Sequence, residues 1–204
     1  RKAALAEALL APPTVVHLAT HGAADLVAGE RSRLVFSPAS DDGKSESLFL
    51  REVYDLPFGG VDLVVLSACE TERGPDVRGE GVQGFSRAVL AAGAARVVTT
   101  LWRVPDAASA ELMRVFYYHL QRGERADAAL ASAKRALLTS EALAHPHYWA
   151  AFVLTGGTDA LPRAMRWRDI GGISLIAAGS LALGLLIRRR LATGVRPPIA
   201  LPTD

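Results

Sequence analysis

Apolar runs of about seven or eight residues alternate with amphipathic stretches between residues 14 and 156. Four of the runs are apolar on both faces and rich in β-branched or aromatic residues: 14–20, 61–68, 95–102 and 148–155. Near-continuous apolar strands are typical of a parallel sheet that is covered on both sides. The pattern therefore predicts four core strands in the middle layer of a three-layer α/β/α sandwich.

The stretches between and beside these runs predict helices and a hairpin. Helical periodicity is found at 50–56, 81–92, 107–122 and 126–140, and a short amphipathic helix is expected in RKAALAEALL at the start. In the third stretch one predicted buried face is made by Leu112, Met113, Val115, Phe116 and Leu120. Two short segments, 34–37 and 47–49, flank a polar turn and predict a hairpin appended to the sheet.

Composition narrows the class of protein. Half of the 204 residues are hydrophobic and 22% are charged, which excludes intrinsic disorder. A single cysteine excludes an internal disulfide and a multi-cysteine metal site. No metal and no cofactor are expected. The net charge of +2 is too small to indicate a nucleic-acid partner.

One segment near the end of the chain predicts a membrane anchor. Residues 170–187 read IGGISLIAAGSLALGLLI, 18 residues without charge or proline. As a helix they would be about 27 Å long, close to the ~30 Å of a hydrocarbon core. Trp167 precedes the segment and three arginines follow it, as at membrane interfaces. A buried helix of the globular domain is the less favoured alternative. With the anchor at 170–187, residues 158–169 would be a linker and residues 188–204 a disordered, basic, Pro-rich tail.

Two of the predicted strands end in side chains of complementary chemistry. His21 comes one residue after the first run, in ATHG, and Cys69 comes one residue after the second, in SACE. Neighbouring parallel strands lie ~4.8 Å apart, so both side chains are expected at the same edge of the sheet. A thiol beside an imidazole can act as a cysteine nucleophile. Gly22 would let the backbone turn sharply, and its N–H and that of Cys69 would form an oxyanion hole. A lone cysteine at a strand end is otherwise often buried and inert.

Longer sequence motifs around these residues resemble those of the CHAT family of caspase-like cysteine peptidases. They are HLATHG, LSACET, GEGVQGFSRAVLAAGAARVVTTLWRVPD, FYYHL and HPHYWAAFVLTG, and they span residues 14 to about 157. The resemblance implies a caspase-haemoglobinase-like fold with a mostly parallel sheet. It also implies that His21 is the general base and acid, that Cys69 is the nucleophile, and that protein substrates are cleaved. In that fold two further strands precede the first run. The domain at 14–157 is therefore expected to lack its first strands, with residues 1–13 as a helix or linker before it.

The segment after the third run bears on substrate choice. The resemblance implies that this segment walls the pocket for the residue preceding the cut. Trp102 would supply an apolar wall and Asp106 would attract a basic side chain. Two alternatives remain open. Asp106 would cap the helix that begins at residue 107, or Arg103 would select an acidic residue instead.

Two further patterns, one for a nucleotide site and one for a metal site, do not predict binding here. Residues 79–84 match the dinucleotide pattern G-x-G-x-x-G, but they follow the strand only after ten residues that include several acids. No nucleotide is therefore expected. His17 and His21 would be ~13 Å apart on a strand, too far to share a metal, so His17 is predicted to be a buried, hydrogen-bonded histidine.

The favoured function is a membrane-anchored cysteine endopeptidase with a Cys–His dyad, acting on protein substrates and switched on by a partner protein. The alternative is a non-catalytic interaction module with the same fold. A reduced thiol and no visible export signal favour a cytoplasmic catalytic domain on a single-pass anchor. The arginines on the two sides of residues 170–187 are too evenly divided to fix the orientation.

Overall fold

The computed structural model describes residues 1–23, 29–37, 45–68, 84–159 and 161. In these residues six strands form one sheet in the order β3-β2-β1-β4-β5-β6. The strands are β1 (Val15–Ala23), β2 (Arg33–Phe36), β3 (Glu46–Phe49), β4 (Leu63–Ala68), β5 (Arg96–Thr100) and β6 (Phe152–Gly156). All four predicted core strands are present, and β1, β4 and β5 lie centrally in the sheet.

The sheet is mixed, so the prediction of a mostly parallel sheet is wrong. β1, β4 and β5 are parallel neighbours, whereas β2, β3 and β6 join antiparallel. The reason for the direction of β6 lies in its connection. Two helices, α4 (Asp106–Gln121) and α5 (Ala126–Leu138), separate β5 from β6. The second helix returns the chain to the edge at which β5 ended, so β6 runs back along β5.

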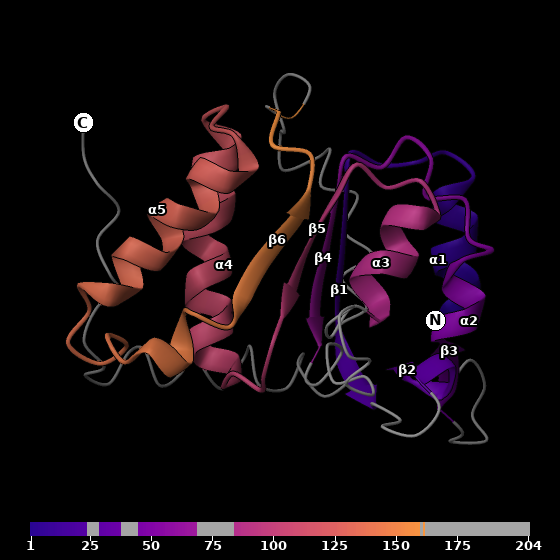
Figure 1. Cartoon of the computed structure of the whole chain (residues 1–204), viewed down its shortest axis with the longest axis horizontal. Helices are drawn as coiled ribbons and strands as arrows, with labels where there is room; N and C mark the ends of the chain where they lie inside the picture. Colours follow the sequence, from indigo (N-terminus) through magenta and orange to yellow (C-terminus); the bar gives the residue numbers. More distant parts are fainter. Residues whose placement is uncertain (24–28, 38–44, 69–83, 160, 162–204) are drawn as a thin grey trace, which may run out of the picture.

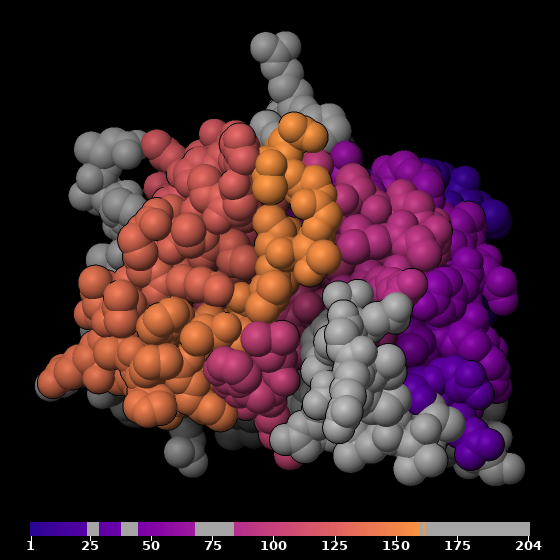
Figure 2. Space-filling model, viewed as in Figure 1, coloured from indigo at the N-terminus to yellow at the C-terminus, as the bar shows by residue number. Residues whose placement is uncertain are grey.

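Helices cover both faces of the sheet, which confirms the three-layer sandwich. On one face lie α1 (Lys2–Leu9), α2 (Leu50–Val53) and α3 (Gly84–Ala91), and on the other lie α4 and α5 (Figure 1). Two short 3₁₀ turns, η1 (Gly29–Arg31) and η2 (Pro146–Tyr148), lie in connections. In the space-filling view the orange β6 lies at the surface between α3 and the α4–α5 layer (Figure 2).

The predicted hairpin is confirmed as β2 and β3, and it extends the main sheet. β2 pairs with the last residues of β1, where His21 lies opposite Val35, and β3 pairs with β2 along its whole length. This added pairing lengthens β1 beyond residue 20, at which the apolar run ends.

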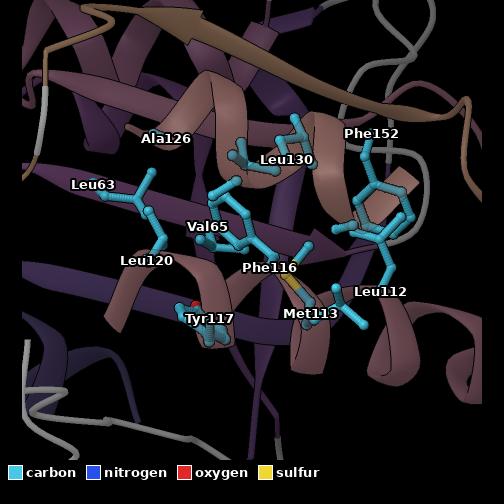
Figure 3. Close-up of a cluster of buried hydrophobic side chains, with 14 of the residues drawn as sticks. Leu63, Val65, Leu112, Met113, Phe116, Tyr117, Leu120, Ala126, Leu130 and Phe152 are labelled. Atoms are coloured by element: carbon cyan, nitrogen blue, oxygen red, sulfur yellow. The ribbon is translucent and has the colours of Figure 1, made fainter. Parts of the chain in front are cut away.

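Two buried clusters hold the layers together, one on each face of the sheet. Alternate residues of a strand point to opposite faces. Leu63 and Val65 therefore meet the α4–α5 layer, while Val64 and Leu66 meet α1, α2 and α3. Figure 3 shows the first cluster, in which side chains of α4 and α5 pack against the sheet and Phe152. The predicted buried face of α4 is confirmed, since all five of its side chains are buried.

None of the helices in the described ranges is long and apolar enough to cross a membrane. The predicted span at 170–187 and the tail at 188–204 lie outside the described residues.

Leucine truncation at matched sites tests the assignment of the core. Leu112 in α4 is fully buried, whereas Leu138 at the end of α5 is 50% exposed. We expect Leu112→Ala to lower the free energy of unfolding by about 2–5 kcal/mol, because it leaves a cavity between α4 and the sheet. Leu138→Ala should lower it by no more than about 0.5 kcal/mol. Urea unfolding of both variants measures the two changes, and equal losses would show that α4 is not packed as described.

Candidate active site

His21 lies within β1 and not beyond it, which corrects the sequence-based prediction. The strand continues through residue 23 because β2 pairs with its last three residues. Gly22 lies opposite Leu34 in this pairing. The backbone is therefore extended at Gly22, and the sharp turn predicted there is absent.

The His21 side chain is exposed at the open end of a covered face. Residues 15, 17, 19 and 21 share one face of β1, since side chains alternate along a strand. Val15 on this face is buried in the α4–α5 cluster, and His17 is held by Tyr117 of α4. Ala19 and His21 are exposed. The α4–α5 layer thus covers β1 as far as His17 and leaves the imidazole of His21 accessible.

The predicted nucleophile, Cys69, lies outside the described residues, as do Glu70, Asp25 and the first five residues of the glycine-rich motif at 79–84. The structure does describe its neighbour in the chain. Ala68 is the last residue of β4, and its Cα lies opposite that of Thr20 in the parallel pairing with β1. His21 and Cys69 each follow one member of this pair directly in the sequence.

Trp102 lies after β5 and joins the start of the β5–α4 connection to the segment before β6. Its indole N–H donates to the carbonyl oxygen of His147, with a nitrogen–oxygen distance of 2.9 Å. The two rings are stacked, with centroids 6.3 Å apart and an interplanar angle of 22°. His147 in turn donates its backbone N–H to Nδ1 of His145. No local pattern in the sequence indicates this stack, because Trp102 and His147 lie 45 residues apart in the chain.

Asp106 is the first residue of α4 and is exposed. The N-cap position belongs to Pro105, and no side-chain hydrogen bond caps the helix. The prediction that Asp106 caps a helix beginning at residue 107 is therefore wrong by one residue. A carboxylate in the first helical turn still interacts favourably with the helix dipole.

His17 is confirmed as a largely buried, hydrogen-bonded histidine. Its Nδ1 lies 2.9 Å from the Tyr117 hydroxyl oxygen, and its Nε2 has no hydrogen-bond partner among the described residues. Burial lowers the pKa of the His17 imidazole to about 4. Burial also raises the pKa of the Tyr117 hydroxyl above its usual range. Sequence reasoning missed Tyr117, because its partner lies 100 residues away in the chain.

Metal binding finds no support in the described part of the chain, where no three or more histidine, cysteine, aspartate or glutamate side chains come together. The described residues place an accessible imidazole at the carboxyl edge of two paired parallel strands, with an indole on the same edge two strands away.

Comparison with known proteins identifies the family. The model of the CHAT domain matches residues 1–157, so the chain belongs to the CHAT domain family. Tetratricopeptide repeat protein 28 of Homo sapiens is 44% identical over 96 residues, which are 47% of this chain, and its Mus musculus counterpart is 43% identical over 96 residues. The match covers 4% of the length of each relative. The family match begins at Arg1 and so includes α1.

The buried imidazole predicts a pH dependence of stability. Between pH 6.5 and about pH 4 the unfolded chain binds a proton at His17 that the folded chain does not. The free energy of unfolding therefore decreases as the pH falls through this range. From pH 7 to pH 5 the loss should be about 2 kcal/mol. Urea unfolding of the unaltered protein and of His17→Gln measures it, because the difference between their pH profiles isolates His17. His145→Gln, at an exposed histidine, should keep the full profile. Parallel profiles for His17→Gln and the unaltered protein would contradict the assignment.

Proposed function

We propose that the chain is a cysteine endopeptidase of caspase-like fold, with His21 and Cys69 as its catalytic dyad. The observation that carries the proposal is the register of the two central strands, in which Thr20 lies opposite Ala68. Consecutive Cα atoms are about 3.8 Å apart and paired strands about 4.8 Å apart. We therefore propose that the residues that follow this pair, His21 and Cys69, lie side by side. Accessibility of the His21 imidazole adds to the support.

The proposed reaction needs no co-reactant other than water. His21 takes the proton of the Cys69 thiol, and the sulfur forms a bond to the carbonyl carbon of the substrate. When the carbon–nitrogen bond breaks, its electron pair goes to the amine nitrogen, which receives the proton from His21. Water then attacks the thioester, His21 accepts its proton, and the sulfur leaves with that proton. The backbone N–H groups of Gly22 and Cys69 are proposed to hold the oxyanion.

The residue preceding the cut is proposed to lie on the β5 side of the dyad. Trp102 would contribute its ring, which the stack on His147 holds in place. Asp106 is exposed in the first turn of α4, where its carboxylate is available to a basic side chain.

A non-catalytic interaction module is the second candidate. One observation favours it: the curated relatives are named for their tetratricopeptide repeats and not for a peptidase activity. Such a module would keep the sheet and its helices and would have no need of a reactive thiol.

Labelling of the thiol separates the two candidates. A peptidyl electrophile that traps thiolates should label Cys69 in the purified protein, and each of Cys69→Ala and His21→Ala should abolish cleavage of peptides. Loss of His21 should also slow labelling by at least about 100-fold, because the imidazole generates the thiolate. Arg135→Gln, which changes an exposed residue of α5 outside the proposed site, serves as the control.

Folding of the variants is checked by urea unfolding, in which His21→Ala should change little, since His21 is exposed. Should the native protein resist labelling in the presence of every candidate activating protein, the peptidase proposal fails and the interaction module stands. Cleavage that survives in Cys69→Ala would exclude Cys69 as the nucleophile.

We further propose that residues 170–187 anchor the protein in a membrane, with the catalytic domain in the cytoplasm. The uncharged sequence of this segment and the arginines that follow it support the proposal. The tether would raise the local concentration of membrane-bound substrates.

Deletion of residues 170–204 tests the anchor. We expect the full-length protein to stay in the membrane fraction after a carbonate wash and the truncated protein to be released. Protease added to intact spheroplasts should leave the catalytic domain uncut. A truncated protein that resists the wash would contradict the anchor, and digestion of the domain from outside would reverse the orientation.

A further inference from the structure

On one face of the sheet, β2, β3 and the part of β1 beyond His17 carry no buried side chain in the described residues. On the opposite face Leu34, Phe36 and Leu48 are buried. On the face of His21, the strand pairing places two rows of side chains, none of which is buried. The first row is His21, Val35 and Ser47, and the second is Ala23, Arg33 and Phe49. We call these six residues the open strip.

The second row of the open strip contains one arginine, Arg33, and lies beside a second arginine, Arg51. Arg33 lies opposite both Ala23 and Phe49, so its side chain is on the same face as His21. The guanidinium carbon of Arg51 lies 4.5 Å from the centroid of the Phe49 ring, on which it stacks. Arg33 and Arg51 are both exposed. Strand pairing thus fixes the face on which the Arg33 side chain lies, and the Phe49 ring holds the Arg51 guanidinium group at the end of the strip.

The nearby carboxylates in the described residues are bound to other groups. Glu52 accepts hydrogen bonds from Lys2 Nζ, at 2.6 Å, and from the backbone N–H of Phe49, at 2.8 Å. Glu46 accepts a hydrogen bond from the backbone N–H of Lys2. The hydrogen bonds from Lys2 and from the Phe49 backbone lower the pKa of the Glu52 carboxyl. Neither Arg33 nor Arg51 forms an ion pair within the described ranges, so both guanidinium groups are available to an acidic ligand.

The order of the strands decides which part of a substrate meets these arginines. From one edge toward the other the order is β2, β1, β4 and β5, with His21 on β1 and Cys69 directly after β4. The acyl part of a cleaved peptide stays on the cysteine sulfur, and the histidine gives its proton to the leaving amine. The leaving amine is therefore on the β1 side of the thiol. The chain that follows the amine leads away from β4, over the open strip.

We infer that Arg33 and Arg51 select acidic side chains in the part of a substrate that follows the cut. The inference rests on the proposed peptidase function and deepens it. From the strand spacing and the rise along a strand, the Cα of Arg33 lies about 8 Å from that of His21. An extended peptide advances about 3.4 Å per residue, so the acidic residues stand at the second and third positions after the cut. Arg33 and Arg51 are specificity residues and take no part in the chemistry.

The test compares matched peptides on the full-length protein. A peptide library digested by the unaltered protein first gives a cleavable sequence. Two quenched fluorogenic peptides with that sequence then differ only at the second and third positions after the cut, which are Asp-Asp in one and Asn-Asn in the other. We expect kcat/KM to be about five- to tenfold higher for the Asp-Asp peptide, as for two partly exposed charge pairs. The ratio should fall toward one in 0.5 M salt.

Substitution of the two arginines completes the test. In the double variant Arg33→Gln and Arg51→Gln the preference for Asp-Asp should disappear. Labelling of Cys69 by an electrophile that occupies only the acyl side should keep its rate, which also shows that the variant is folded. Arg135→Gln, which removes an exposed arginine from α5, should retain the preference.

The outcomes distinguish this inference from the function on which it rests. Normal labelling together with equal cleavage of the two peptides, or a preference that survives in the double variant, overturns the role of the arginines alone. Failure of the unaltered protein both to be labelled and to cleave any peptide overturns the peptidase proposal, and the inference with it.

Discussion

The pairing of β1 with β4 is the interaction on which the rest of the structure depends. Six consecutive residues of each strand are opposite one another in parallel register. Their side chains supply both buried clusters, Val15, Leu63 and Val65 to one and Val16, Leu18 and Leu66 to the other. A slip of one residue would exchange the faces of a strand and expose side chains that are now buried, so the register is strongly specified. The same register places Thr20 opposite Ala68, the residues that directly precede His21 and Cys69 in the sequence.

The two helical layers differ in how far they extend, and this difference leaves room for a site. On the α1–α3 side the buried cluster includes the hairpin residues Leu34, Phe36 and Leu48. On the other side α4 and α5 pack over β4, β5 and β6, and the Tyr117 hydroxyl at His17 marks the limit of their cover on β1. Beyond it the sheet carries side chains that a partner can reach. A sheet face with no helix over it can carry polar groups such as His21 and Arg33 without the cost of burying them.

Much of the fold follows from short-range patterns in the sequence. The apolar runs and the periodicity of residues 107–122 are local signals, and the structure confirms the strands and the buried face of α4 that they predict. Strand direction is less local. The run that becomes β6 is as apolar as a central parallel strand, because its first residues pack against α4 and α5, yet it lies antiparallel at an edge. Its direction depends on the number of helices before it, and the pattern of the run itself does not contain that number.

The candidate site shows the same division between local and distant determinants. His21 could be singled out from its own sequence context. Its placement inside β1, the stack of Trp102 on His147 and the hydrogen bond between Tyr117 and His17 could not, because each depends on residues that lie far away in the chain.

The hairpin links the length of β1 to the chemistry available around His21. Without β2, residues 21–23 would have no strand beside them in the described residues, because the pairing with β4 is described only as far as Thr20. Antiparallel pairing with β2 keeps them extended, and it fixes which side chains of β2 and β3 share the face of His21. A hairpin that is peripheral to the core thus determines what lies next to the imidazole. Changes in its exposed residues can therefore alter the surroundings of the His21 imidazole without disturbing the buried pairing of β1 and β4 on which the fold depends.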